Sequence, residues 1–494
     1  MTLHPTLACL FAVCAALAAS ADPATRREKD LIGEKDVPAA AYYGVQTARA
    51  LENFQISGIP TSRYPELVEG LALVKMAAAR ANADVGALPK EKRDAIEKAG
   101  RAILAGKYHD QFGVDLYQGG AGTSTNMNAN EVMANIGLEG MGKKKGDYAA
   151  LSPNDDLNMS QSTNDAYPTA LKVAFMRRND YLVTELEALV EAFRAQGAEH
   201  LRLLKMGRTE MQDAVPMTVG QEMYAFADAL EGEIAALKHA EAGLYAVNLG
   251  GTAIGTGLNA PPGYAERAAA QLADLTGKPI VLAPDLISAT WDLGSFRAYS
   301  SALAGLAVKL SKISSDLILL SSGPRAGLGE IDLPALQPGS SIMPGKVNPV
   351  MPELMNVVAF RVMANDLAVT LAAQSGQLQL NAYEPLAAIA VLESQELLRT
   401  ALPAFRTKCV EGITPNKDAL ARQIDETVGI VTALNPVLGY KQASAIAAEA
   451  YQSGRGVIEI IREKKLLTEA QIEDLLDPEK LTGLDPKQYQ PRAR

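Results

Sequence analysis

The sequence contains few of the residues from which disulfide, zinc and histidine-based sites are built. Only three cysteines occur in 494 residues, and Cys9 and Cys14 lie within the first 21 residues. Cleavage after that segment would leave Cys409 alone, which excludes an intramolecular disulfide. The four histidines fall in no motif, and neither a CxxC nor an HExxH spacing is present. These absences argue against a zinc site and against a histidine-based triad.

Aromatic residues and net positive charge are also lacking. Phe, Trp and Tyr make up 5% of the chain, whereas Ala and Leu are abundant, which favours helix. The formal net charge of −10 argues against nucleic acid as a partner, and an acidic substrate would need local positive groups. With 48% hydrophobic and 21% charged residues, the composition is that of an ordinary soluble globular protein, long enough for several domains.

The first 21 residues differ from everything after them. Leu7 to Ala19 is an apolar run of thirteen residues, too short to span a membrane, and Ala19-Ser20-Ala21 provides small residues before Asp22. This pattern predicts a cleaved signal peptide over residues 1–21 and a periplasmic or secreted protein. The segment before the run has no Lys or Arg, so a misplaced start upstream of a cytoplasmic enzyme is the alternative.

Apolar residues recur at helical spacing in the middle of the chain. Between Thr169 and His200 the first Gly or Pro is Gly197, and about 30 helical residues would form a rod of about 45 Å. Rods of this length pair in bundles, and their wide, Ala-rich stripes predict a bundle that other subunits complete. The two clearest stripes are Leu182, Leu186, Leu189, Val190 and Phe193, and Leu303, Leu306, Leu310, Ile313 and Leu317.

Composition and periodicity divide the rest of the chain into three parts. We expect a mixed N-terminal domain rich in short helices over residues 22–161, a central helix-bundle domain over residues 162–416 and a small C-terminal helical domain over residues 417–494. Thr468-Glu469 is typical of a helix start. The glycine-rich run Gly250–Gly257 lacks the GxGxxG order of a dinucleotide loop, and we interpret it as a helix-terminating turn.

One loop concentrates residue types that carry chemistry. Residues Gly339–Pro349 read GSSIMPGKVNP, with two glycines, two prolines, a serine pair, one lysine and one asparagine. Prolines fix φ and glycines open conformations closed to other residues, so the segment is a shaped loop and not a helix or strand. A linker is the alternative, but long helical stretches flank the segment. Loops that present Ser, Lys and Asn together are usually functional.

This loop resembles the signature loop of the aspartase/fumarase superfamily. The similarity extends from about Asp30 to the C-terminus, and it implies a mainly α, three-domain chain with a twenty-helix core in a homotetramer. Each active site in that superfamily gathers segments from three subunits. The resemblance implies no organic cofactor, although some members respond to Mg²⁺. The other matching segments are Ala41–Thr47 (AYYGVQT), Gly119–Glu131 (GGAGTSTNMNANE), Ser162–Thr169 (STNDAYPT) and Gly207–Glu222 (GRTEMQDAVPMTVGQE).

The match is closest to the ammonia-lyases of this superfamily and implies reversible deamination of L-aspartate to fumarate and ammonia. This reaction needs a base for a weakly acidic C3 proton and donors that hold the enediolate-like carbanion. By resemblance Ser340 is the base, as an oxyanion that main-chain N–H groups and a nearby cation would stabilise. Ser341 would hold the carboxylate that accepts charge. Lys346 and Asn348 would bind the other carboxylate, and Met343 would support the loop.

Upstream segments supply the remaining donors by the same resemblance. Ser162, Thr163 and Asn164 form a compact donor cluster, in which Asn164 would contact the amino group of the substrate. A helix N-cap is a second role for Ser162 or Thr163, and both roles are compatible because a helix N-terminus favours anions. The other implied donors are Thr123 and Ser124, after a glycine-rich turn without a P-loop pattern, and Thr209, beside the carboxylate held by Lys346.

A few positions separate aspartases from fumarases. Tyr43, Val45 and Tyr167 resemble the aspartases, and fumarases carry a histidine where this chain has Glu210. A carboxylate there would either contact the substrate ammonium or repel the dicarboxylate, and Glu353 lies near the same pocket in the superfamily. Fumarate hydratase, which these positions disfavour, is the alternative function. A non-catalytic, exported binding protein with a lyase fold is the third hypothesis.

Overall fold

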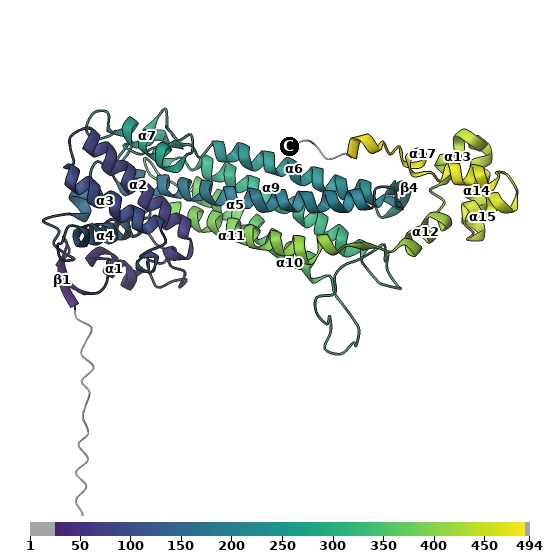
Figure 1. Cartoon of the computed structure of the whole chain (residues 1–494), viewed down its shortest axis with the longest axis horizontal. Coiled ribbons are helices and arrows are strands. Elements are labelled where there is room, and N and C mark those ends of the chain that lie inside the picture. Colours follow the sequence, from purple (N-terminus) through teal and green to yellow (C-terminus); the bar gives the residue numbers. More distant parts are fainter. Residues whose placement is uncertain (1–24, 490–494) are drawn as a thin grey trace, which may run out of the picture.

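Five long helices run side by side along the molecule and form its central bundle (Figure 1). The computed structural model describes residues 25–489, so the predicted signal peptide lies outside the described residues. The bundle confirms the mainly helical fold that the composition predicted. Its helices are α5 (Thr163–Glu199), α6 (Val219–Ala242), α9 (Gly294–Leu320), α10 (Val350–Gln374) and α11 (Glu384–Lys408).

The remaining elements lie at the two ends of this bundle (Figure 1). At one end are β1 (Thr25–Lys29), β2 (Glu34–Pro38), α1 (Val45–Asn53), η1 (Thr61–Arg63), α2 (Pro65–Asp84), α3 (Lys90–Leu104), η2 (His109–Gln111), α4 (Thr123–Gly140), η3 (Pro153–Leu157), β5 (Ala246–Val247), α7 (Tyr264–Thr276), β6 (Val281–Leu282) and α8 (Leu286–Trp291). At the other are β3 (Leu204–Thr209), β4 (Gln212–Thr218), β7 (Ile331–Asp332), η4 (Val410–Gly412), β8 (Thr414–Pro415), α12 (Lys417–Glu426), α13 (Val431–Leu438), α14 (Tyr440–Ser453), α15 (Val457–Glu463), α16 (Glu469–Leu475), α17 (Pro478–Thr482) and η5 (Pro486–Tyr489).

Among residues 25–489, the strands form four two-stranded ladders that connect or brace helices. β1–β2, β3–β4 and β7–β8 are antiparallel, whereas β5–β6 is parallel. β3 and β4 form a hairpin between α5 and α6. The β7–β8 pair joins the long α9–α10 connection to the C-terminal part of the chain.

The predicted apolar stripes face the bundle core. Every residue of both stripes, on α5 and on α9, is buried, which confirms the helical period read from the sequence. The C-terminal helices enclose a smaller apolar core of their own, to which Met206 of β3 also belongs. The stripes therefore position the long helices, and the site residues at their ends.

The helix α5 is longer than the sequence indicated, because it begins at Thr163 and continues through Pro168. Proline has no N–H to donate, so the carbonyl of Asn164 lacks its ordinary partner one turn later. Asn248 supplies a substitute, since its Nδ2 donates to that carbonyl at 3.0 Å. A contact from a distant segment thus permits proline inside the helix.

The predicted domain limits coincide with capped helix ends. Ser162 caps α5 and Asn416 caps α12, at the expected borders of the central domain. The division into domains itself remains a prediction. Thr468 caps α16 at Glu469, which confirms that predicted helix start. The N-terminal part differs from the expectation of short helices, since α2 has 20 residues and α4 has 18.

The apolar surface of α10 is only partly covered within one chain. Among residues 25–489, α10 alone is long and apolar enough to cross a membrane, a test of length and composition that core helices of globular proteins also pass. An exposed apolar face of this extent is typical of an interaction surface. Its exposed apolar residues are Leu354, Val357, Phe360, Leu367 and Leu371.

Candidate active site

The N-terminal end of α5 presents the first group of predicted donors. The Oγ of Ser162 accepts the main-chain N–H of Asn164 at 3.2 Å, and Asp165 accepts the N–H of Ser162 at 2.9 Å. The expected N-cap role of Ser162 is thereby confirmed. Thr163 is buried, whereas Ser162 and Asn164 are half-buried. We call Ser162–Asn164 the donor turn, where helical N–H groups favour an anion.

The pair Thr123–Ser124 opens α4 directly beside the donor turn. The preceding residue, Gly122, has a φ of 84°, and a Cβ there would lie 2.3 Å from the Tyr167 ring of α5. Only glycine permits this approach of the two helix ends. Asn126 strengthens it, because its Nδ2 donates to the Oγ1 of Thr163 at 3.2 Å. The structure thus brings these two groups of predicted residues together.

The glycine-rich run Gly250–Gly257 packs against the donor turn, and our interpretation of it as a helix-terminating turn was wrong. The run follows the strand β5 and not a helix end. Asp165 accepts the main-chain N–H groups of Gly250 and Thr252 at 2.9 and 3.0 Å. The Nδ2 of Asn164 donates to a carbonyl of the same run at 2.7 Å. A two-residue strand leaves no periodic signal, so the sequence could not reveal this context.

Two buried charged groups lie behind the donor turn, and the sequence analysis identified neither. Asp165 and Lys75 both have 0% of their surface exposed. Burial raises the pKa of Asp165 to about 6 against the effect of its main-chain hydrogen bonds, and burial lowers the pKa of Lys75 to about 7 against the attraction of Asp165. A signal for Lys75 was present, because it is the single charged residue in the apolar run Leu71–Ala79 of α2.

The loop Gly339–Pro349 projects from the bundle beside α10 and contains neither helix nor strand, as predicted (Figure 1). The Oγ of Ser340 accepts the main-chain N–H groups of Ile342 and Met343, each at 3.1 Å. Two N–H groups that converge on one hydroxyl oxygen stabilise negative charge on that oxygen. The local geometry of Ser340 therefore suits a base.

Other predicted residues of this loop have different surroundings. Ser341 and Lys346 are exposed, and Glu353 is exposed in the first turn of α10. The Nδ2 of Asn348 donates to the carbonyl of Gly339 at 3.0 Å, and the N–H of Gly339 donates to the carbonyl of Lys346 at 2.6 Å. Asn348 thus also closes the loop, a structural role that the sequence did not indicate.

Thr209 and Glu210 lie at the tip of the β3–β4 hairpin. Glu210 and Met211 have φ values of 51° and 66°, which is the geometry of a two-residue hairpin turn. Arg208 forms an ion pair with the buried Glu330, which braces the base of the hairpin. A cavity of about 360 Å³ lies beside the tip. Its charged lining residues are Lys205, Arg208, Glu210, Glu222, Lys312 and Asp316.

The donor turn and the hairpin lie at opposite ends of the bundle. α5 has 37 residues, which corresponds to a rod of about 55 Å. The donor turn lies at the first residues of α5, whereas the hairpin follows the last. The Ser340 loop lies beside α10, away from the end that contains α2, α4 and α7 (Figure 1). The predicted site residues of one chain therefore do not all lie together.

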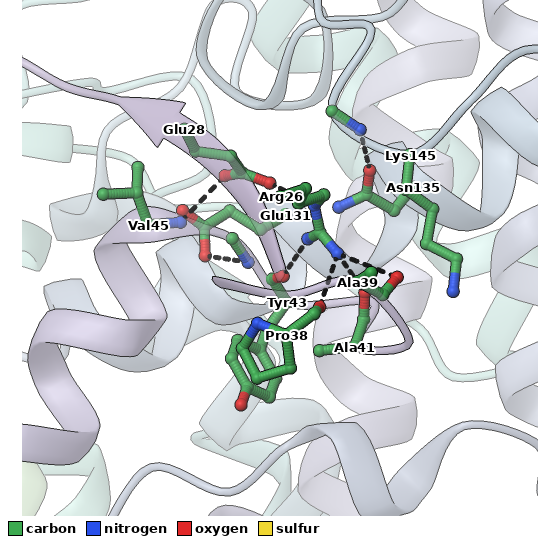
Figure 2. A network of polar contacts seen from close by, with 12 residues as sticks. Arg26, Glu28, Pro38, Ala39, Ala41, Tyr43, Val45, Glu131, Asn135 and Lys145 are labelled. Carbon is green, nitrogen blue, oxygen red and sulfur yellow. Dashed lines mark hydrogen bonds and ion pairs between the residues drawn. The ribbon is translucent and has the colours of Figure 1, made fainter. Parts of the chain in front are cut away.

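The motif segment Ala41–Thr47 is held by two buried carboxylates (Figure 2). Glu131 accepts three main-chain N–H groups of the segment at 2.8 to 3.1 Å, and Glu28 accepts a fourth at 2.9 Å. Arg26 forms an ion pair with Glu28 at 2.7 Å and donates to carbonyl oxygens of the segment. Burial raises the pKa of Glu131. This motif therefore anchors the N-terminal strands to α4.

Family models match most of the chain, including every predicted site residue. A model described as lyase matches residues 33–364, and a model described as fumarase C C-terminus matches residues 430–483. The chain belongs to the aspartase/fumarase family of lyases. The first match contains the donor turn, the hairpin and the Ser340 loop. The bundle described above is thus the bundle of the aspartase/fumarase family.

Members of this lyase family resemble the chain over nearly its whole length. An aspartate ammonia-lyase from Pseudomonas fluorescens is 56% identical over 92% of this chain and 96% of its own length. A fumarate lyase:delta crystallin structure from Brucella melitensis has a TM-score of 0.89 at 50% identity and covers 92% of this chain and 99% of that one. A class II fumarase from Schistosoma mansoni has a TM-score of 0.84 at 33% identity, with coverages of 92% and 98%. The predicted aspartase/fumarase fold is confirmed.

Proposed function

We propose that this protein is an aspartate ammonia-lyase, which converts L-aspartate reversibly into fumarate and ammonia. The observation that carries the proposal is the Ser340 oxygen, which receives two main-chain N–H groups in a loop that also contains Lys346. Such a base suits removal of a weakly acidic proton next to a carboxylate. The substrate choice is supported by 56% identity to the P. fluorescens aspartate ammonia-lyase, against 33% to the S. mansoni fumarase.

In the proposed reaction Ser340 removes the C3 proton of L-aspartate, and the electron pair moves into the adjacent carboxylate. Ser341 holds that carboxylate in its enediolate-like form. Lys346 and Asn348 bind the other carboxylate by charge-assisted hydrogen bonds. The electron pair then returns to form the C2–C3 double bond, the C2–N bond breaks, and the amino group that Asn164 contacted leaves as ammonia.

The proposed elimination needs no organic cofactor, because the carboxylate of the substrate accepts the electron pair. Within residues 25–489, no group of three or more His, Cys, Asp or Glu side chains is arranged to hold a metal ion. Activation by Mg²⁺, as in some relatives, remains a prediction.

The test follows the ultraviolet absorbance of fumarate, with L-aspartate or L-malate supplied in parallel to the protein from Asp22 onward. We expect fumarate from L-aspartate and none from L-malate. Fumarate from L-malate alone would replace the proposal with fumarate hydratase. No fumarate from either substrate, with a folded protein, would favour the non-catalytic binding protein.

We further propose that the active sites form between chains of a homotetramer. The donor turn and the hairpin stand about 55 Å apart along α5, too far for one small dicarboxylate to contact both. The exposed apolar face of α10 supports the same proposal, since packing of a second copy would remove Val357 and Phe360 from water. Closed symmetric assembly would then bring one chain's Ser340 loop to another chain's donor turn.

Mixing two inactive variants tests whether chains share sites. Ser340→Ala and Asn164→Ala each damage one part, so co-expressed chains would form hybrids in which some sites have both parts intact. Random assembly predicts about a quarter of wild-type activity when the two residues come from different chains. Each variant expressed alone is the control. Hybrids as inactive as their parents would place both residues in one chain's site.

The exposed carboxylate of Glu210 gives another prediction. Glu210→Gln keeps the size of the side chain and removes a charge that repels a dicarboxylate, so we expect deamination to be preserved or raised. Steady-state kcat and KM for L-aspartate measure this, with the exposed Glu473→Gln on α16 as the control for charge. A collapse in kcat would instead show that Glu210 contacts the substrate ammonium.

A further inference from the structure

Lys75 has a buried amino group that amide oxygens, and not a carboxylate, hold in place. Its Nζ donates to Oδ1 of Asn158 at 3.1 Å and to Oε1 of Gln161 at 2.9 Å. The side chain comes from α2 and has 0% of its surface exposed. In the described part of the chain, its Nζ has no carboxylate within ion-pair distance. Asp165, on the far side of the donor turn, contributes only attraction at longer range.

Burying the amino group of Lys75 without a carboxylate partner is unfavourable for folding. Removing an ammonium from water without a hydrogen-bonded counter-ion is strongly unfavourable. Apolar side chains of similar volume often replace buried ion pairs without loss of stability, and Lys75 has no carboxylate partner that its replacement would leave unpaired. Methionine would extend the apolar run around Lys75 on α2. Stability alone therefore does not account for a lysine at this position.

The partners of Lys75 belong to the segment that leads directly into the donor turn. We call residues 158–161 the strap. Oδ1 of Asn158 also accepts Nδ2 of Asn126 and of Asn130, both at 3.1 Å. Gln161 uses its Nε2 for the carbonyls of residues 157 and 159, at 3.0 and 3.1 Å. Together with the hydrogen bonds from Lys75, these contacts fix the side chains of Asn158 and Gln161 in one orientation.

The strap connects this network to both groups of predicted donors. Asn126 donates to Asn158 and to the Oγ1 of Thr163, so one amide joins the strap, α4 and the donor turn. Gln161 is the residue before the N-cap Ser162. Lys75 thus fixes the entry of the donor turn, while Asp165 holds its main chain from the other side.

We propose that Lys75 is a positioning residue, whose amino group fixes the strap by hydrogen bonds and thereby orients the donor turn toward the substrate. The inference rests on the proposed function, since the donor turn is the part of the lyase site that would bind the dicarboxylate. Lys75 does not touch the substrate. It acts through Gln161 and Asn158.

The test compares two buried lysines. Lys75→Met fills a similar volume and leaves Oδ1 of Asn158 two other donors, whereas the half-buried Oε1 of Gln161 loses its donor, so we expect the melting temperature to fall by only a few degrees. We expect kcat/KM for L-aspartate to fall about 100-fold, because small misplacements of binding groups are that costly. We expect most of this decrease to come from a higher KM. We also expect weaker binding of succinate, a dicarboxylate that does not react.

Lys172→Met is the matched control. Lys172 is also buried, lies on α5 and donates to the carbonyl of Ala246 at 2.6 Å, without contact to the strap. Lys172 also attracts the buried carboxyl of Glu384, which Lys172→Met would leave without its cation, so we expect this variant to lose thermal stability while its folded protein keeps kcat/KM. Wild-type kcat/KM in Lys75→Met, or a parallel loss of stability and activity in both variants, would overturn the proposal.

A variant that leaves Lys75 in place tests the proposal even if Lys75→Met does not fold. Gln161→Ala removes one acceptor of the amino group, and we expect the same rise in KM and the same loss of succinate affinity. Unchanged KM in Gln161→Ala would overturn the proposal even if Lys75→Met fails to fold. Wild-type protein that produces no fumarate rejects the proposed function instead, whereas succinate-induced thermal stabilisation still compares the variants without turnover.

Discussion

Ser340→Ala is expected to lower kcat for L-aspartate deamination by about 10³-fold, the usual contribution of a positioned base. The Oγ of Ser340 is the atom on which two main-chain N–H groups converge, so alanine removes both the base and the oxygen that these groups stabilise. Steady-state kinetics with the purified variant measure the loss. The effect belongs to kcat, because the lysine and asparagine of the loop still bind substrate.

Two measurements separate loss of the base from collapse of the loop. Ser375→Ala is the control: it removes an exposed hydroxyl that donates to the carbonyl of Leu371 in α10, and we expect it to leave kcat unchanged. Succinate should bind Ser340→Ala about as well as wild type if the loop keeps its shape. Activity of Ser340→Ala close to wild type would assign the base to another residue.

Lys346→Met is expected to raise KM for L-aspartate about 100-fold, since a charge-assisted hydrogen bond to a carboxylate contributes about 1.5–3 kcal/mol. Lys346 is exposed in one chain, and its main chain rather than its ammonium closes the loop. Methionine therefore keeps the loop while removing the cation. The initial rate as a function of L-aspartate concentration provides KM and kcat separately.

The control for this second effect is Lys441→Met, which removes one positive charge from the exposed surface of α14. Both variants make the net charge more negative by one, so a general electrostatic effect on an acidic substrate would affect them equally. An unchanged KM in Lys346→Met would show that the ammonium does not contact the substrate carboxylate.

Features that depend on neighbours in the sequence were predictable. The shape of the Gly339–Pro349 loop follows from its prolines and glycines, and the stripes on α5 and α9 follow from helical spacing. A cap at Ser162 or Thr163 was also expected, and the structure places it at Ser162, where Asp165 completes a capping box. The family was predictable because five sequence motifs resemble those of the aspartase/fumarase superfamily and occur in the same order.

Features that depend on packing between distant segments could not be predicted from the sequence. α5 continues through Pro168 because Asn248 satisfies the carbonyl of Asn164, and the glycine-rich run is a partner of Asp165 and not a helix end. Nothing within either segment records these contacts, since each partner lies more than 80 positions away along the chain.

The sequence by itself determined the apolar stripes of the long helices, the shaped loop with Ser340 and the membership of the lyase family, because propensities, φ restrictions and motifs act over a few residues. Only the tertiary structure decided which of these parts meet. It placed the donor turn and the hairpin at opposite ends of α5, and it brought Lys75 of α2 beneath the donor turn. Such meetings follow from the packing of whole helices, in which a buried amino group finds its acceptors only after remote segments have come together.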